Sequence, residues 1–297
     1  MKNLLILGGT GRMGSALAAC LGGRFKVTTL ARNEYADLRA DINDFVDYQG
    51  YDVVVNCAAM KDVVKCETQV PECIAANVTG VAFSLEHAAR CGVKRYIYIS
   101  TDMAVDVKNV YGASKKIADA LVVNMARTSN TECCVVRLGN IIGSAGSIFT
   151  TLASKSKELG YMPITDIGMT RFLMMASDCA DFVSSVVEYK GSVKGDIFAP
   201  KCKSYRVVDI AKAVAENVPI RVIGKRLGDE LSVTMISDSE LLRTTSGVGG
   251  HYRILPPWSD EHIEVVDMGG LAYLSSENNP SFASVEELRD IYCSLLE

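Results

Sequence analysis

The stretch Leu4-Leu5-Ile6-Leu7-Gly8-Gly9-Thr10-Gly11-Arg12-Met13-Gly14 decides the fold. Its four leading apolar residues fit a buried strand, and the apolar spacing that follows fits a helix over Met13–Leu21. Glycines between a strand and a helix allow a tight turn and a close backbone approach, and the helix N-terminus holds a pyrophosphate. The stretch therefore predicts a dinucleotide site formed by Gly8, Thr10, Gly11, Arg12, Met13 and Gly14.

The first half of the chain alternates short β-rich runs with longer amphipathic segments. This alternation predicts a parallel sheet covered on both faces, and right-handed crossovers make it doubly wound. The predicted strands are Leu4–Leu7, Lys26–Leu30, Asp52–Cys57, Tyr96–Ser100 and Cys133–Leu138. The predicted helices are Met13–Leu21, Val70–Cys91 and Tyr111–Thr128.

The pattern is less regular after about residue 140, where glycines and prolines divide it into short pieces. Helices are predicted at Ala176–Tyr189 and Val207–Val218, which return to the sheet or form a small lobe. We therefore expect an α/β fold with a dinucleotide-binding domain over residues 1–165. Residues 166–297 are expected to return partly to the sheet and to form a small C-terminal substrate-binding lobe.

Composition excludes several classes of function. The 297 residues are 48% hydrophobic, and 31 basic against 35 acidic side chains give a net charge of −4. Without a long basic run, neither a nucleic-acid partner nor a membrane surface is expected. The N-terminus enters a strand directly and no segment is long enough to span a bilayer, which predicts a cytoplasmic protein. The ten cysteines lack CxxC spacing and the three histidines lack ligand spacing, so no metal site is assigned.

The end of the second predicted strand indicates which dinucleotide binds. Arg32 stands where an NAD-specific protein would place an acidic residue, and an arginine there accommodates the 2′-phosphate of NADP. The sequence thus favours NADP over NAD, with Arg12 as a second positive group, although either arginine could be an ordinary solvated one. Asp41 and Ile42 are expected at the adenine edge, and the small residues Ala58 and Ala59 would let the cofactor lie against the backbone.

A second group of residues predicts the chemistry. Ser100-Thr101-Asp102 ends a predicted strand, and Tyr111 and Lys115 lie four apart, on one face of the next helix. A phenol titrates near pH ~10, so a base working at neutral pH needs a pKa lower by about three, or roughly 4 kcal/mol. The ammonium of Lys115 and the positive charge of a nicotinamide can supply that change. Thr101 would share the proton and orient a substrate hydroxyl.

These motifs together resemble the extended short-chain dehydrogenase/reductases, a Rossmann family that acts on nucleotide-sugars. Within that group the chain is similar over most of its length to the inverting UDP-N-acetylglucosamine 4,6-dehydratases of polysaccharide biosynthesis. The segments that carry this similarity are residues 58–61, 72–74, 77–80, 100–102, 111–115, 136–140, 163–166 and 169–172. Residues 224–230 resemble that family's diphosphate-contacting loop, and residues 275–280 resemble its closing segment.

The resemblance implies roles for individual residues. Thr101, Asp102, Tyr111 and Lys115 would be catalytic, with Asp102 protonating the departing C6 hydroxyl. Lys61, Asn77, Tyr111 and Lys115 would join the cofactor site. The nucleotide-sugar, expected to be UDP-linked, would contact Lys61, Met103, Asn140, Arg171 and Arg226, and the guanidinium of Arg226 suits its diphosphate. A homo-oligomer is also expected.

The chain departs from the family at positions that affect the chemistry. The family has a lysine after Ser-Thr-Asp that takes part in C5 proton removal, and here that position is Met103. A thioether cannot accept the proton at neutral pH, and losing a general base typically costs ~10²–10⁴ in rate. Lys61, Asp102 or Tyr111 could stand in. Leu227 replaces Pro, Glu230 replaces Lys and Val233 replaces Glu in the phosphate loop.

Three functions follow from this pattern. The first is a 4,6-dehydratase, which oxidises C4, removes the C5 proton, releases the C6 hydroxyl as water and returns a hydride to C6. The second is a C4 epimerase or 4-keto reductase, which Met103 favours because neither reaction needs a base at C5. The third is a non-catalytic NADP-binding sensor, against which the intact Tyr111 and Lys115 argue.

Overall fold

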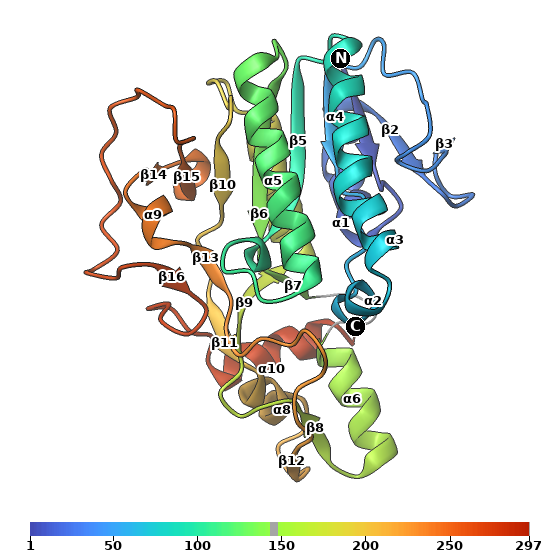
Figure 1. The fold of residues 1–297 in the computed structure, drawn as a ribbon. Coiled ribbons are helices and arrows are strands. Elements are labelled where there is room, and N and C mark those ends of the chain that lie inside the picture. Colours follow the sequence, from blue (N-terminus) through green and yellow to red (C-terminus); the bar gives the residue numbers. More distant parts are fainter. Residues whose placement is uncertain (143–147, 297) are drawn as a thin grey trace.

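The computed structural model describes residues 1–142 and 148–296, and its centre is a large sheet (Figure 1). Nine of the described strands form this sheet in the order β14-β15-β10-β6-β5-β4-β1-β2-β3. Their bounds are β1 Lys2–Leu7, β2 Phe25–Ala31, β3 Leu38–Arg39, β4 Val53–Asn56, β5 Arg95–Thr101, β6 Glu132–Leu138, β10 Ile197–Ala199, β14 Thr244–Ser246 and β15 Tyr252–Ile254.

All neighbouring strands from β10 to β3 are parallel, whereas β15 runs antiparallel to β10 and β14 runs antiparallel to β15. The predicted parallel sheet is confirmed, and each of its five predicted strands is found within two residues of its expected ends. The second half of the chain adds β10, β14 and β15 to the sheet. Because these strands have only three residues each, they were not recognisable in the sequence.

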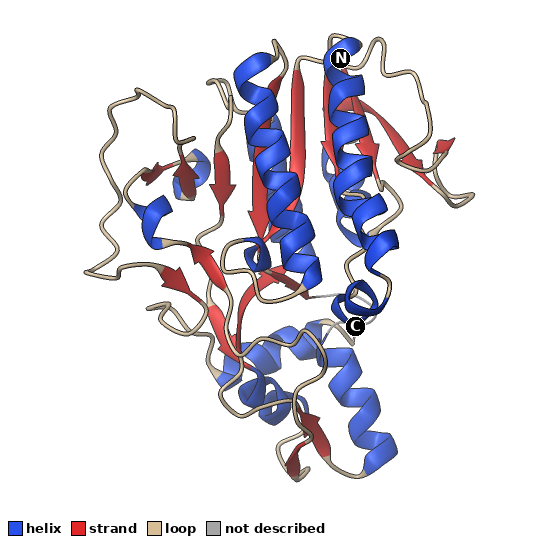
Figure 2. Ribbon diagram, viewed as in Figure 1, coloured by secondary structure: helices blue, strands red, loops and turns tan. Residues whose placement is uncertain are grey.

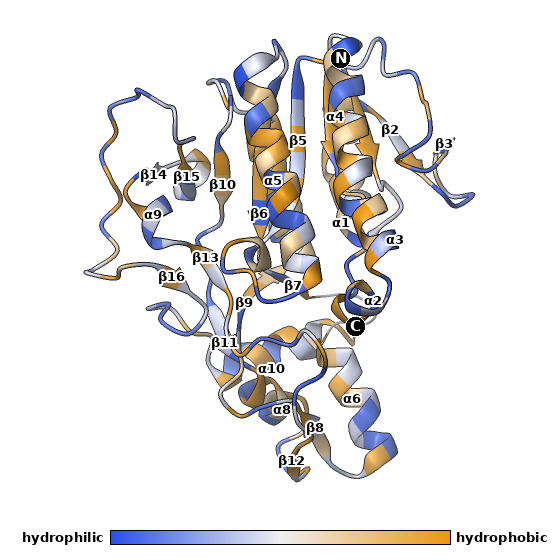
Figure 3. Ribbon diagram, in the orientation of Figure 1, coloured by the Kyte–Doolittle hydropathy of each residue, from blue (hydrophilic) through white to orange (hydrophobic). Residues whose placement is uncertain are grey.

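Helices cover both faces of the sheet, as predicted. Alternate residues of β1 point to opposite faces, so Leu5 lies in a core with α4 and α5 while Leu4 lies in a core with α1 and α7. Figure 3 shows hydrophobic residues along much of β6 and β10 and an alternation of hydrophilic and hydrophobic residues along α5. These helices span α1 Arg12–Leu21, α4 Gly80–Arg90, α5 Val110–Thr128 and α7 Ala176–Val187.

The helix predicted over Val70–Cys91 is present, but its winding changes along its length. It consists of α3 (Val70–Ile74), a π-helical turn over Ala75–Thr79 and then α4. A π turn shifts the side chains that follow it around the helix, and turns of this kind are frequent at functional sites. Here the turn contains Asn77, which is fully buried.

A smaller lobe lies below the sheet in the view of Figure 2. Its core contains apolar residues of α6, β8, α8 and α10, and β7, β9 and β11 form a three-stranded sheet beside it. The boundary between residues 165 and 166 stays a prediction; in the structure, α6 and β8 already pack with the lobe. The bounds are α6 Ile148–Leu159, β7 Asn140–Ile142, β8 Met162–Ile164, β9 Thr170–Met175, β11 Ser204–Arg206, α8 Val207–Val214 and α10 Val285–Ser294.

Short elements complete the described chain: α2 Val63–Thr68, the 3₁₀ turns Asp102–Ala104 and Val248–Gly250, β12 Ile220–Val222, β13 Thr234–Ile236, α9 Asp238–Leu241 and β16 Leu274–Ser275. The predicted helix Val207–Val218 ends earlier, at Val214, because Ala215 has an extended backbone. None of the helices in the described ranges has both the length and the apolar character needed to cross a membrane.

Candidate active site

The glycine loop packs so tightly that side chains cannot enter it. Gly8 has a φ of +73°, and a Cβ atom there would lie 2.7 Å from the backbone nitrogen of Ala58. A Cβ on Gly14 would lie 2.4 Å from the Gly8 carbonyl oxygen. Gly11 precedes α1 and has no side chain to cap it. The first amides of α1 therefore suit an anionic ligand such as a pyrophosphate.

A cavity of about 710 Å³ opens at this loop, beyond the carboxyl ends of β1, β2 and β4. We call it the cofactor cavity, because ligands of doubly wound sheets bind at such ends and because its volume suits a cofactor. The predicted cofactor residues that line it are Gly8, Thr10, Gly11, Arg32, Asp41, Ile42, Ala58 and Ala59. Its lining also includes residues that were not predicted to bind a cofactor, notably Asn33, Met60, Lys65, Gln69 and Glu72.

Arg32 lies at the edge of the cofactor cavity with most of its side chain in solvent. Its exposed fraction is 83%, and its Nε lies 3.8 Å from a carboxylate oxygen of Asp41. A hydrogen bond from the backbone of Asn43 is the main cause that holds the pKa of Asp41 below its usual value. Beside Arg32, the Asn33 amide donates to the Thr10 hydroxyl at 2.9 Å. An exposed cation in this position can meet a 2′-phosphate.

Other predicted cofactor residues lie next to the cavity and do not line it. Asn77 donates to the Met60 carbonyl at 2.8 Å and accepts from the Met60 amide at 2.7 Å, so it holds a segment of the wall in place. Met13, the second residue of α1, packs into the core. Arg12 donates to the Ile141 carbonyl at 3.3 Å. Burial, and then the charge of Arg12, lower the pKa of Lys61, which places these two cations near each other.

The predicted catalytic residues meet where β5 ends and α5 begins. Thr101 is the last residue of β5, and its hydroxyl donates to Asp102 at 3.0 Å. The N-terminus of α5 approaches this turn closely, since a Cβ on Gly112 would lie only 2.4 Å from the Met103 carbonyl oxygen. This approach places Tyr111 near Thr101, whose hydroxyl lowers the pKa of Tyr111 against the effect of burial. The structure thus assembles Thr101, Asp102 and Tyr111 as expected.

Lys115 is buried, and its ammonium points to the backbone of β5. Its ammonium donates to the Ile99 carbonyl at 2.7 Å and lies 4.1 Å from the centre of the Tyr98 ring. Burial lowers the pKa of Lys115 to about 8, against the opposing charge of Asp119. Burial and the charge of Asp102 raise the pKa of Tyr111, so the expected lowering is absent from the chain alone. The positive charge of a bound nicotinamide is the remaining source of that effect.

Asp102 is 1% exposed, and its Oδ2 atom has no hydrogen-bond partner. Burial raises the pKa of Asp102 to about 6, although the Thr101 hydrogen bond and the charge of Arg171 lower it. A carboxyl group with this pKa can hold a proton near neutral pH and donate it from the free oxygen. Met103, next to it, packs partly buried against the core and carries no titratable group.

Arg171 comes from β9 and lines the lobe side of the site. It is 6% exposed, and it donates to the carbonyls of Thr170 and Glu230 at 2.7 Å each. Tyr205 lies near Asn140 and Arg171, and its buried hydroxyl has no hydrogen-bond partner among the described residues. Burial raises the pKa of Tyr205 to about 12, and the charge of Arg171 opposes this. Asn140 and Arg171 thus lie around Tyr205, and the charge of Arg171 acts on Asp102. Their contact with a nucleotide-sugar stays a prediction.

Arg226 is placed differently from these residues. Its side chain is 69% exposed and its guanidinium forms two contacts of 3.0 Å with Asp229 in the same loop. Arg226 therefore lies outside the buried group formed by Asp102 and Arg171. Its predicted contact with a diphosphate would require the Asp229 pairing to be shared or broken.

The sequence did not identify three residues that complete the site. Glu230 is 4% exposed and one of its oxygens has no partner, while Asn109 both caps α5 and donates to Glu230 at 2.7 Å. Tyr205 enters through the antiparallel pairing of β11 with β9. Glu230 was visible only as a departure from a family pattern. No sequence signal marked Asn109 or Tyr205, because their positions depend on contacts between distant segments.

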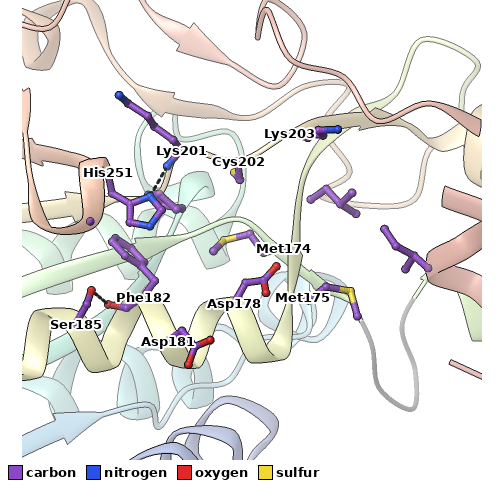
Figure 4. A pocket seen from close by; sticks show the side chains of 14 residues that line it. Met174, Met175, Asp178, Asp181, Phe182, Ser185, Lys201, Cys202, Lys203 and His251 are labelled. Atoms are coloured by element: carbon purple, nitrogen blue, oxygen red, sulfur yellow. Dashed lines mark hydrogen bonds between the residues drawn. The ribbon is translucent and has the colours of Figure 1, made fainter. Parts of the chain in front are cut away.

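A second cavity, of about 480 Å³, lies between α7, β9 and the segment 200–203 (Figure 4). Its wall includes Met174, Phe182, Cys202 and His251, and the Lys201 amide donates to His251 at 3.0 Å. None of the predicted site residues lines this cavity. It therefore takes no part in the site described above.

Comparisons with known proteins agree with this geometry. A family model described as "Polysaccharide biosynthesis protein" matches residues 26–254. The UDP-N-acetylglucosamine 4,6-dehydratase (inverting) of Campylobacter jejuni is 34% identical over 98% of this chain and 97% of that protein. A UDP-glucose 4-epimerase of Rickettsia felis is 32% identical over 99% of this chain and 96% of that protein.

Solved structures give the same fold. The X-ray structure of Pen from Bacillus thuringiensis has a TM-score of 0.88 and 25% identity, covering 99% of this chain and 98% of that one. DesIV, a dTDP-glucose 4,6-dehydratase from Streptomyces venezuelae solved with NAD and TYD bound, has a TM-score of 0.68 and 21% identity over 77% of this chain and 86% of its own. The chain belongs to the polysaccharide biosynthesis protein family and is an enzyme of the short-chain dehydrogenase/reductase type.

Proposed function

We propose that this enzyme is an NADP-dependent 4,6-dehydratase of a UDP-linked sugar, with UDP-N-acetylglucosamine as the first substrate to test. The names of its relatives from Campylobacter jejuni and the shared motifs support the substrate. Arg32 at the edge of the cofactor cavity supports NADP over NAD. A homo-oligomer and a cytoplasmic location stay predictions.

The chain's own residues account for oxidation at C4. Tyr111 takes the proton of the C4 hydroxyl, Thr101 orients that hydroxyl, and Lys115 supplies positive charge beside them. Bound NADP⁺ supplies a hydride acceptor at C4 and later a donor at C6. The narrow glycine loop and the small side chains of Ala58 and Ala59 leave room for such a cofactor, so the residues present fit it.

The free, buried oxygen of Asp102 is the observation that favours dehydration. A C6 hydroxyl leaves readily only when it is protonated, so elimination needs an acid at this point. Asp102 lies beside Thr101 and is shielded from water, and its pKa of about 6 leaves a protonated fraction near neutral pH. A reaction confined to C4 has no departing C6 hydroxyl that Asp102 would protonate.

A C4 epimerase or 4-keto reductase is the second candidate, and Met103 favours it. The residue that removes the C5 proton in the resembled family is absent at this position. Relatives from Rickettsia with about the same identity are named UDP-glucose 4-epimerase. Both candidates share the C4 oxidation and differ in whether the product has lost water.

Product mass separates the two candidates. Purified enzyme incubated with UDP-N-acetylglucosamine and catalytic NADP⁺ is expected to give a product lighter by one water. An isomer of unchanged mass would refute dehydration and support epimerisation. As a control, Tyr111→Phe should reduce turnover by ~10²–10⁴ while still binding NADP⁺. Full activity in that variant would remove Tyr111 from the mechanism.

A further inference from the structure

The proposed dehydration needs a group that removes the C5 proton, and Glu230, which contacts Asn109 at the start of α5 and Arg171, is a candidate. It follows Gly228 and Asp229 in the loop that leads to β13, yet its side chain is only 4% exposed. One carboxylate oxygen accepts from the Asn109 amide at 2.7 Å, and the other, Oε2, is buried without a hydrogen-bond partner. A carboxylate buried in this way has an unused acceptor inside the protein.

Hydrogen bonds to its backbone hold Glu230 close to the start of α5. Arg171 donates to the Glu230 carbonyl at 2.7 Å, and Asn109 also donates to the Gly228 carbonyl at 3.1 Å. Asn109 is the N-cap of α5, two residues before Tyr111. One short network therefore ties the Glu230 loop to the helix that presents Tyr111.

The charges around Glu230 suit reversible proton transfer. Burial raises the pKa of Glu230 to about 7. The charges of Lys108 and Arg171 lower it, while those of Asp102 and Asp106 raise it. A base works best when its pKa lies near the working pH. Because the charge of Asp102 acts on the pKa of Glu230, the two carboxyl groups lie close enough to interact electrostatically.

We propose that Glu230 is the base that removes the C5 proton in place of the lysine missing at Met103. This inference rests on the proposed dehydration. The carboxylate takes the proton, the C5–H electron pair becomes the C5–C6 double bond, and the C6–O bond breaks. Asp102 gives its proton to the departing hydroxide, which leaves as water. Protons and electrons balance within this step without any added oxidant or reductant.

Glu230→Gln tests the assignment, because it keeps the shape and the Asn109 contact but cannot take the proton. We expect C4 oxidation, followed as NADPH absorbance in a single turnover, to persist while water loss falls by ~10²–10⁴. Asp290→Asn removes an exposed carboxylate of α10 that is not among the charges acting on Glu230 or Asp102, and it should leave both steps unchanged. Water loss at the wild-type rate in Glu230→Gln would overturn the proposal, as would loss of C4 oxidation together with water loss.

A rescue variant gives a second readout. Adding Met103→Lys to Glu230→Gln returns a base to the family's position, and we expect water loss and C5 deuterium uptake from D₂O to recover at least tenfold. If the lysine restores neither signal, Glu230 does not perform the proton removal that the family's lysine performs. If the wild-type enzyme itself never loses water, dehydration fails as the proposed function, a result that is distinct from any behaviour of the variants.

A separate observation concerns a side-chain cluster at the opposite end of the sheet. His87 and Cys91 lie one turn apart at the end of α4, and Asp47 comes from the connection between β3 and β4. The Cys91 sulfur lies 3.7 Å from His87 Nε2 and 3.8 Å from Asp47 Oδ1, and the three ligand atoms all lie within 4.8 Å of one another. Sequence spacing alone did not suggest a metal here, because Asp47 is distant along the chain.

The two sulfur distances fit a tetrahedral metal. Zinc–sulfur and zinc–nitrogen bonds of about 2.3 and 2.0 Å separate the two ligand atoms by about 3.5 Å. Phe45 and Tyr48 contact the His87 ring edge-on, with ring centres 4.7 and 4.6 Å away, and so restrict its orientation. The ligands also lie at the C-terminal end of α4, where the helix dipole favours a cation.

We further infer that Asp47, His87 and Cys91 bind a zinc-like divalent cation, with a water completing the tetrahedron. Because Asp47 follows Asp41 and Ile42 in the same connection, the metal would fasten a wall of the cofactor cavity to α4. The residues involved contact none of the catalytic groups, so this site would be structural.

Cobalt(II) reports directly on such a site. Reduced, metal-free protein titrated with Co²⁺ should develop a thiolate-to-cobalt charge-transfer band with one equivalent bound. Cys91→Ser and His87→Gln should each lower the affinity at least tenfold, and Cys91→Ser should abolish the band. Cys293→Ser, which changes an exposed thiol on α10, should leave it intact. Absence of the band in the unaltered protein, or its persistence in Cys91→Ser, would refute the site.

Discussion

Lys115 illustrates how burial determines what a side chain can contribute. The residue is 2% exposed and its ammonium donates to a backbone carbonyl of β5, so its positive charge stays fixed at the start of α5. The spacing of Tyr111 and Lys115 correctly predicted a shared helical face. It did not predict the pKa of Tyr111, which burial and Asp102 raise in the chain alone. Desolvation depends on the surrounding elements, and sequence spacing does not report it.

The pH dependence of dehydration follows from two carboxyl groups. Glu230 must be deprotonated to act as the base, so activity should rise as pH approaches its pKa of about 7. Asp102 must be protonated to act as the acid, so activity should fall as pH rises beyond its pKa of about 6. We expect a narrow bell with its maximum between these values in a plot of kcat against pH. A plateau extending well above pH 8 would contradict these roles.

Arg32 should determine the choice of dinucleotide. Its guanidinium is exposed at the cavity edge and loosely paired with Asp41, so it can turn toward a 2′-phosphate. Arg32→Ala should weaken NADP⁺ binding about tenfold or more, since a charge-assisted contact contributes roughly 1.5–3 kcal/mol, and should leave NAD⁺ binding nearly unchanged. Titration calorimetry with both dinucleotides measures this difference. Arg39→Ala is a control, because that side chain is outside the cavity lining.

At the scale of elements, the glycine loop shows how strand, turn and helix depend on one another. The motif at Gly8, Gly11 and Gly14 was recognisable because nearby backbone atoms leave little room for a side chain at each of these positions. The ends of β1, β4, β5 and β6 were predictable for a similar reason, since these strands are largely buried and strands buried on both faces are continuous apolar runs. The helices α6 and α10 were missed, and in the described part of the chain their buried apolar residues belong to the core of the lobe.

Gly14→Ala tests the tight packing of this loop. The new methyl group would lie 2.4 Å from the Gly8 carbonyl oxygen, a backbone atom that cannot move aside. We expect a loss of stability of about 1–3 kcal/mol and a marked loss of NADP⁺ affinity. Gly23→Ala is the matched control, because nothing lies within 4 Å of its added Cβ. Unfolding by urea and dinucleotide titration give the two readouts; equal behaviour of both variants would contradict the steric argument.

At the scale of the molecule, a buried ion pair joins the central sheet to the C-terminal half. Arg137 of β6 is fully buried and makes two contacts, of 3.1 and 3.0 Å, with Glu240 of α9, and it also donates to the Met235 carbonyl. Burial alone would raise the pKa of Glu240, but the charge and hydrogen bonds of Arg137 lower it to about 2. This pair anchors the segment that follows the Glu230 loop.

Glu240→Gln should destabilise the whole protein by about 3–5 kcal/mol, because it leaves the Arg137 charge buried and uncompensated. Arg137→Met combined with Glu240→Leu should recover most of that loss, since apolar pairs often replace buried ion pairs at little cost. In the unaltered protein the depressed pKa of Glu240 contributes stability above about pH 4.5, which is lost as pH falls toward 2. Denaturant unfolding at several pH values measures both effects. A double variant whose loss of stability equals the sum of the losses from the two single substitutions would contradict the pairing.

The sequence by itself determined the parallel sheet, the cofactor loop and the Thr101, Tyr111 and Lys115 group, because strand burial, glycine sterics and helical spacing are local properties. Only the tertiary structure decided where Glu230, Tyr205 and Asn109 lie. Their positions result from loop closure and antiparallel pairing between segments far apart in the chain. Tertiary packing also removes Asp102 and Glu230 from water, and desolvation of this kind decides which side chain can hold or accept a proton.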